Sequence, residues 1–304
     1  GKGVVGVRDY EMAENIDTWI SRFSQGLDGL RVEAGIYPER LRQAIDDGWH
    51  TGDELPGSHG LGHVGAMKMI SDGSLNTRSA YCSMPYSGIR PETYGTLSYA
   101  PEQIESYMRL AVEHGFDIAC HAIGDEANTI VLDCAERTHA HGSIEHAQML
   151  KERDIPRLAQ LGLAVSIQPQ HAMDDRDVIA RFWGTPAGIP YAFNSLHKAG
   201  TKLLMGSDAP VAPLDPWMAI SAAVFGTESS DREPFQPEQC LDFETALASS
   251  TAVGRVALRD ADAADLVLLD CDPSIIDSPE AMRAMPEHVL GTMLAGRWTY
   301  QQAE

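Results

Sequence analysis

Four ionisable side chains stand within or at the end of short apolar runs of this sequence. Lys68 lies inside GAMKMI, His121 ends DIACH, His146 ends SIEH and Asp208 ends LLMGSD. An unpaired charge buried in such a run would cost several kcal/mol, so a functional partner is expected. Imidazoles and a carboxylate suit Zn²⁺, and a lysine can join them only when it is carbamylated. The four side chains therefore predict a site for one or two divalent ions.

Taken singly, each of these residues has an ordinary structural explanation. A histidine at the end of a strand often only satisfies its own hydrogen bonds, and a lysine in a strand is usually solvated at an edge. A Gly-Ser-Asp triplet typically forms a turn. The metal site is favoured by the whole set, because the four residues lie on four different predicted strands.

The elements that must position these residues alternate regularly. Amphipathic segments such as 101–115, with Pro101 in its first turn and Gly115 at its end, are typical of helices. Between such segments lie seven β-rich runs that start about 33 residues apart, the size of a βα unit. These runs cover residues 3–9, 30–37, 65–70, 117–124, 143–147, 163–170 and 202–209. The alternation predicts an α/β fold, a (β/α)8 TIM-type barrel with seven strands present, whose site lies at the strands' C-terminal ends.

The pattern changes near residue 260. ADLVLLD, beginning at Ala264, and HVLGTMLAGRWTY, ending at Tyr300, are typical of β-strands with no long helix between them. We therefore expect a barrel over residues 1–260 and a small, partial β-sandwich element over residues 261–304.

The charge balance and the cysteines exclude several classes of protein. Lys and Arg number 23 against 44 Asp and Glu, a formal net charge of −21, which disfavours nucleic acid and anionic membranes as partners. No apolar run approaches the ~20 residues of a membrane span. The five cysteines include no Cys-x-x-Cys pair, which argues against a disulfide framework or a thiolate zinc site. These features predict a cytoplasmic protein.

Several motifs of this chain occur together, and in this order, in one known family. They are GAMKMISDGSLNTRSA (65–80), CHAIGDEAN (120–128), SIEHAQ (143–148), SIQPQH (166–171) and GSDAPV (206–211), with ADLVLLDCDP and AGRWTY in the tail. In these motifs the sequence resembles the amidohydrolase superfamily, in particular the YtcJ-like branch called amidohydrolase family 3. The resemblance covers essentially the whole chain.

The resemblance implies a metal-dependent hydrolase of non-peptide C–N bonds, acting on a small-molecule substrate, an N-acyl or N-formyl amine or a cyclic amide. It implies that His121 and His146 are metal ligands and that Lys68 is a carbamylated bridging ligand. Asp208 would bind metal and act as general base toward the bridging water. Zinc is the expected ion, because neutral imidazoles and a carboxylate suit Zn²⁺. A bound divalent ion brings the pKa of its water toward ~7, which gives hydroxide at neutral pH.

The resemblance also implies a set of residues beside the substrate. Arg78 would bind a carboxylate or acyl oxygen, and Gln148 and His171 would hydrogen-bond the substrate. An alternative for Arg78 is that it anchors its own loop through Asp72. The charged run at 174–177 is typical of a solvated helix start.

One feature departs from the family pattern. The family's barrel begins with a strand that carries His-x-His, whereas segment 3–9 resembles the family's second strand. The His-x-His of this chain, His139-Ala140-His141, lies in a polar connection and is not expected to bind the metal. We expect an N-terminal segment or a second chain to complete the barrel, and homo-oligomers are compatible with that. The alternatives are a catalytically impaired barrel and a barrel isomerase or decarboxylase on the same scaffold.

Overall fold

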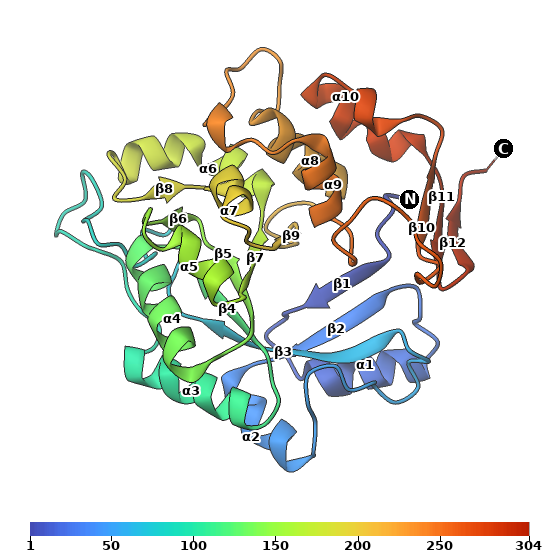
Figure 1. Ribbon diagram of the computed structural model, residues 1–304, viewed down its shortest axis with the longest axis horizontal. Helices are drawn as coiled ribbons and strands as arrows, with labels where there is room; N and C mark the ends of the chain where they lie inside the picture. The colour runs from blue at the N-terminus through green and yellow to red at the C-terminus, as the bar shows by residue number, and fades with distance from the viewer. Residues whose placement is uncertain (304) are drawn as a thin grey trace.

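A single parallel sheet of seven strands forms the centre of the molecule (Figure 1). The computed structural model describes residues 1–303. The strand order is β1-β2-β3-β4-β5-β7-β9, and every neighbouring pair is parallel. The strands are β1 Gly6–Asp9, β2 Arg31–Ile36, β3 Gly62–Ile70, β4 Ile118–Ala122, β5 Gly142–His146, β7 Ala164–Ile167 and β9 Leu203–Met205. All seven predicted strands are confirmed, and the sheet curls as part of a TIM-type barrel.

Helices connect the strands and lie around the outside of the curled sheet (Figure 1). They are α1 Asn15–Ser24, α2 Pro38–Asp46, α3 Pro101–Glu113, α4 Asp125–Thr138, α5 Ile155–Gln160, α6 Pro169–Phe182, α7 Phe193–Lys198, α8 Pro216–Phe225, α9 Phe243–Ser249 and α10 Pro279–Arg283. Among residues 1–303, no helix has the length and apolar character that crossing a membrane requires.

Helix α3 shows how local sequence sets these boundaries. Pro101 occupies its first position, and the Gln103 side chain accepts a hydrogen bond from the backbone N–H of Ala100 at 3.0 Å. The chain leaves the helix through Gly115, whose φ of +73° suits glycine. The helix predicted over residues 101–115 is confirmed.

The register of the sheet decides which residues share one edge of it. Ile70 at the end of β3 is paired with His121 of β4, and Ala122 of β4 is paired with His146 of β5. Since parallel strands end at the same edge, the two histidines are brought together there. Apolar side chains such as Ile118 and Ile144 are fully buried on these strands and anchor them in the core.

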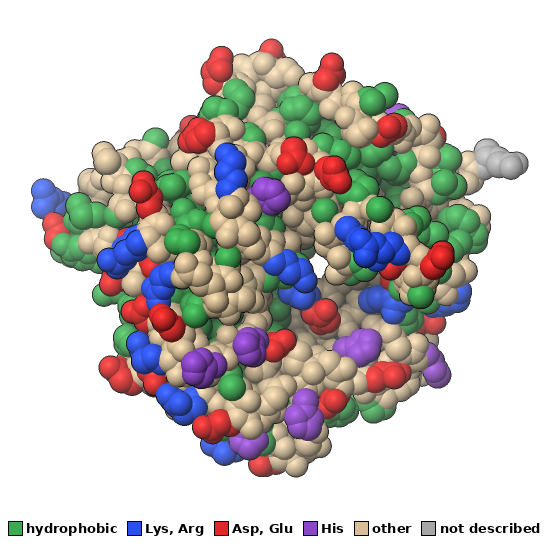
Figure 2. Space-filling model, in the orientation of Figure 1, with side chains coloured by type: hydrophobic (Ala, Val, Ile, Leu, Met, Phe, Trp, Pro, Cys, Tyr) green, Lys and Arg blue, Asp and Glu red, His purple; other side chains and the backbone are tan. Residues whose placement is uncertain are grey.

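Strands β1 and β9 are the two edges of the curled sheet. In the orientation of Figure 1, the space-filling view shows a hollow between these two strands, with basic and acidic side chains on its rim (Figure 2). Two short strands, β6 Met149–Leu150 and β8 Ile189–Pro190, pair outside the main sheet.

The C-terminal part forms a separate antiparallel sheet of β10 Leu266–Leu269, β11 Val289–Leu294 and β12 Arg297–Gln301. The predicted strand segment that ends at Tyr300 therefore forms a hairpin of β11 and β12. The Arg31 guanidinium on β2 pairs with the Asp265 carboxylate through both oxygens, at 2.5 and 3.1 Å, and joins this sheet to the barrel. Short 3₁₀ turns at Pro237–Gln239, Pro273–Ile275 and Met285–His288 complete the chain.

Candidate metal centre

Three histidines and one aspartate meet where the barrel strands end. His121 lies on β4, His146 ends β5, His171 lies in the first turn of α6 after β7, and Asp208 follows β9. The rings of His121 and His146 are 4.5 Å apart between centroids, and those of His146 and His171 are 6.1 Å apart. His171 Nε2 lies 3.3 Å from Asp208 Oδ2. Ligand-type atoms of His146, His171 and Asp208 all lie within 4.8 Å of one another, a spacing that one metal ion can bridge.

Three residues at the site have positive φ angles, a backbone conformation that residues other than glycine rarely adopt. His146, Ala147 and Asp208 have φ values of +74°, +46° and +56°. Such residues cost roughly 1–3 kcal/mol each and persist where the surrounding structure enforces them, often at functional sites. The strain therefore falls on two of the residues whose side chains converge.

Burial keeps the two strand histidines uncharged. It lowers the pKa of His121 to about 4, and the positive charge of Lys68 adds to that effect. Burial likewise holds the pKa of His146 well below its usual value, and His121 and Lys68 lower that pKa further. Near neutral pH both rings are imidazoles with a free lone pair, which is the form that binds a metal ion.

Buried polar atoms without partners support metal or substrate binding here. Within residues 1–303, His146 Nδ1, Gln148 Oε1 and Gln168 Oε1 are buried and have no hydrogen-bond partner. A buried polar atom is nearly always satisfied, so these three atoms are free to contact a further polar group or ion. Two imidazoles with a carboxylate match the ligand preference of Zn²⁺. The residues therefore fit a divalent metal ion.

Lys68 is buried on β3, and its Nζ lies 4.9 Å from the centre of the Tyr10 ring. The positive charge of Lys68 helps to lower the pKa of both strand histidines. An ammonium group cannot bind a metal ion, so Lys68 can join the ligands only as a carbamate.

Three residues are predicted to bind substrate. His171 belongs to the cluster with His146 and Asp208, and Gln148 follows His146 closely in the chain, whereas Arg78 lies outside this cluster. Gln148 is buried two residues after His146, and its Oε1 is one of the unpartnered atoms. Arg78 is exposed in the β3–α3 connection, where its Nη1 donates to the Asn76 carbonyl at 3.1 Å and its guanidinium lies over the Phe182 ring. The Asp72 carboxylate accepts from backbone N–H groups instead, so the alternative anchoring of Arg78 through Asp72 is wrong.

The sequence prediction for the charged run at 174–177 is wrong for Asp175. This residue lies in the middle of α6 and is buried. Its carboxylate accepts hydrogen bonds from the Tyr191 hydroxyl and the Asn76 amide, both at 2.7 Å. A helix start is predicted there because the β-rich run extends to Gln170, whereas Pro169 is already the first residue of α6.

His139 and His141 lie away from the site, as expected. His139 caps the C-terminal end of α4, and His141 precedes β5, so both stand at the opposite end of that strand from His146. A second group of metal-type side chains, Asp270, Cys271 and His288, lies partly exposed at the C-terminal sheet. There His288 Nδ1 is already paired with Asp270 at 2.8 Å.

A sequence model described as "Amidohydrolase family" matches residues 16–300. The chain belongs to the amidohydrolase family. Protein LONG AFTER FAR-RED 3 of Arabidopsis thaliana is 31% identical over 256 residues, which cover 78% of this chain and 43% of the plant protein. Putative amidohydrolase YtcJ of Bacillus subtilis is 29% identical over 289 residues, which cover 88% of this chain and 54% of that protein. The predicted family resemblance is confirmed.

Two further relatives bear on the chemistry of this amidohydrolase. N-substituted formamide deformylase of Arthrobacter pascens is 25% identical over 226 residues, covering 69% of this chain and 41% of the enzyme. The crystal structure of an uncharacterized metal-dependent hydrolase from Pyrococcus horikoshii superposes with a TM-score of 0.70 at 27% identity, covering 82% of this chain and 50% of that one. The chain spans about half the length of the curated relatives that it matches.

Two residues at the site have surroundings that the sequence does not reveal. The sequence suggests Asp72 only as a partner of Arg78, and it gives Gln168 no role. Asp72 lies two residues past β3, beside a strand-end histidine, and Gln168 directly follows β7. Position immediately after a barrel strand is the available signal for both.

Proposed function

We propose that this amidohydrolase hydrolyses a non-peptide C–N bond of a small amide, either an N-acyl or N-formyl amine or a cyclic amide. The observation that carries the proposal is the position of His146 at the ends of the barrel strands. Its ring lies 4.5 Å from that of His121, and its ligand-type atom lies within 4.8 Å of those of His171 and Asp208. His146 Nδ1 is buried and unpartnered among the described residues. The relative named as a formamide deformylase supports the N-formyl class.

The residues would divide the work as follows. His121 and His146 hold a divalent ion, which we propose is zinc, and Lys68 joins as a carbamate if a second ion is present. When bound, such an ion lowers the pKa of a coordinated water and polarises the substrate carbonyl. Asp208 takes the proton released by the attacking water and returns it to the leaving nitrogen. Water thus supplies a hydroxyl group to the carbonyl carbon and its other hydrogen to the leaving nitrogen, while the C–N bond breaks.

The substrate would be oriented by residues around this group. The buried amide oxygen of Gln148 can accept a hydrogen bond from an N–H group of the substrate. His171, 3.3 Å from Asp208, holds that carboxylate or contacts the substrate directly. The exposed guanidinium of Arg78 can bind a carboxylate or acyl oxygen of a substrate that reaches the β3–α3 connection.

We also propose that further polypeptide, an N-terminal segment or a second chain, lies between β1 and β9 and brings the His-x-His of the family pattern. These two strands are edges of a curled sheet, and an unpaired edge exposes rows of N–H and C=O groups.

We propose a cytoplasmic location for the protein. The five cysteines are free thiols, which supports this location.

Asp208→Asn tests the proposed general base. We expect zinc-loaded protein to hydrolyse members of a panel of N-formyl amines, N-acyl amines and cyclic amides, measured by release of the free amine. In the variant kcat falls about 10²–10⁴-fold, because the proton acceptor is lost. Asp17→Asn, at an exposed position on α1, is the matched control and keeps full activity.

Two results would contradict this account. Retention of wild-type kcat by Asp208→Asn would remove Asp208 from the reaction. Zinc-loaded protein that hydrolyses nothing in the panel would favour the alternative, an impaired barrel that keeps metal ligands without activity.

A further inference from the structure

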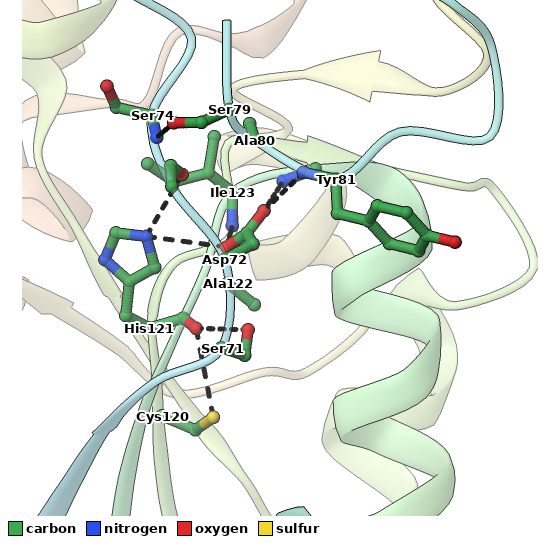
Figure 3. Close-up of polar contacts among 12 residues, drawn as sticks. Ser71, Asp72, Ser74, Ser79, Ala80, Tyr81, Cys120, His121, Ala122 and Ile123 are labelled. Carbon is green, nitrogen blue, oxygen red and sulfur yellow. Dashed lines mark hydrogen bonds and ion pairs between the residues drawn. The ribbon is translucent and has the colours of Figure 1, made fainter. Parts of the chain in front are cut away.

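The Asp72 carboxylate lies fully buried at the junction of two loops that follow neighbouring strands (Figure 3). Its Oδ1 accepts a hydrogen bond from Ile123 N–H at 3.0 Å, and its Oδ2 accepts from Gly124 N–H at 2.9 Å. Oδ2 also accepts from Tyr81 N–H at 2.8 Å, within its own β3–α3 connection. One carboxylate therefore joins the connection after β3 to the turn after β4.

The same carboxylate faces the ring of His121. His121 Nε2 lies 3.5 Å from Asp72 Oδ1 and 3.3 Å from the carbonyl oxygen of Gly73 (Figure 3). The Gly73 carbonyl can only accept a hydrogen bond. Nε2 must then carry the hydrogen of the neutral ring, which leaves the lone pair on Nδ1.

The backbone of His121 is fixed from the same side. Its carbonyl oxygen accepts from the Ser71 N–H at 3.0 Å and from the Ser71 hydroxyl at 2.6 Å. The two loops are also closely packed, because a Cβ at Gly124 would lie 2.0 Å from the carbonyl oxygen of Tyr81. Both the ring and the backbone of His121 are therefore held by residues 71–73.

Asp72 itself is out of reach of a substrate. Its side chain has no exposed surface, and both oxygens are already engaged by three backbone N–H groups. It therefore acts through His121 and not on the reacting atoms. A metal-binding histidine commonly donates its other N–H to a carboxylate or carbonyl, which fixes its tautomer and orientation.

We propose that Asp72 is a positioning residue for the metal centre. With the Gly73 carbonyl it holds His121 as the Nε2–H tautomer, so that Nδ1 is the atom offered to the ion. It also ties the β3–α3 connection, which carries Arg78, to the position of that histidine. This inference rests on the proposed function, since it assumes that His121 binds the metal.

The tautomer can be measured without any metal. Metal-free protein labelled with ¹⁵N in its histidines is placed near pH 8 and measured by long-range ¹H–¹⁵N correlation, and the His121 signals are assigned by their loss in His121→Ala. We expect the pattern of an Nε2–H ring. The Nδ1–H pattern, or a mixture of both tautomers, would overturn the proposal whatever the metal does.

The second experiment compares Asp72→Asn with Asp125→Asn by competition for zinc with a chromophoric chelator. Asp125 is the matched control, because it is equally buried and binds the N–H of Ser83 in the same connection. We expect about 10–100-fold weaker zinc binding for Asp72→Asn. Asp125→Asn should bind zinc within about threefold of wild type while losing comparable thermal stability.

The outcomes separate the two claims. Wild-type zinc affinity in Asp72→Asn, or an equal loss in both variants, would overturn the positioning role while leaving the metal centre standing. Wild-type affinity in His121→Ala would instead contradict the proposed function. If Asp72→Asn does not fold, the tautomer measurement on the wild-type protein can still overturn the proposal.

Discussion

At the scale of the residue, His146 combines backbone strain with an unsatisfied buried nitrogen. Its φ is +74°, and its Nδ1 has no partner within residues 1–303. Either feature alone lowers stability, and both are retained at a strand end where His121, His171 and Asp208 lie close to His146. A trade of stability for function is the simplest physical explanation.

His146→Asn tests that explanation. Asparagine tolerates positive φ better than most residues but lacks the imidazole, so zinc affinity should fall at least about 100-fold, whereas the melting temperature of metal-free protein should shift by only ~2–4 °C. Calorimetric zinc titration and thermal unfolding measure the two effects. His139→Asn is the matched control, since His139 also has positive φ, at +55°, but caps α4 far from the site. Unchanged zinc affinity in His146→Asn would remove this ring from the ligands.

Residue types at strand ends are enough to predict part of the site from the sequence alone. His121, His146 and Asp208 are predictable because each ends an apolar run whose strand character is local. The role of Asp72 is not, because its partners Ile123 and Gly124 lie 51 and 52 residues away. The burial of Asp175 is hidden for the same reason, since Asn76 is 99 residues distant.

At the scale of the element, the strands are predictable and some boundaries are not. Parallel strands buried on both faces are continuous apolar runs, which local sequence displays directly. The strand expected over 163–170 ends at Ile167, because Pro169 lacks the N–H that a sheet needs and begins α6 instead. The C-terminal segment ending at Tyr300 is a hairpin, with Ala295 at φ +48° and Gly296 at +78° in its turn.

Helix α9 provides a pH-dependent prediction at this scale. The Asp242 carboxylate caps the helix by accepting from Thr245 N–H at 2.8 Å, and that hydrogen bond lowers the pKa of Asp242. Asp242→Ala should cost about 1 kcal/mol at pH 7, as expected for an exposed N-cap. Because the folded-state pKa lies below the usual 3.8, this stabilisation is present above about pH 3.8 and is lost as the pH falls through the lowered value.

Urea unfolding of both proteins at a series of pH values measures the effect. The difference between wild type and Asp242→Ala should shrink as the solution is acidified below pH 3.8. Asp242→Asn is the control, because it keeps an oxygen acceptor but cannot titrate. A difference that grows with acid would show that the carboxylate does not stabilise α9.

At the scale of the whole molecule, the curled sheet has two edges, β1 and β9, with a hollow between them (Figure 2). If further polypeptide covers these edges, the 33.1 kDa chain should not persist alone as a monomer. Sedimentation velocity combined with intact-mass measurement should find a larger assembly or an additional polypeptide. A folded, monodisperse monomer of 33.1 kDa would contradict the proposed closure.

The most direct test of the metal centre is anomalous diffraction at the zinc absorption edge from crystals of the protein grown with zinc. The account predicts a strong peak among His121, His146 and Asp208, with ligand distances of about 2.0–2.2 Å. Strong zinc elsewhere, for example at Asp270, Cys271 and His288, with none at the strand ends, would contradict it.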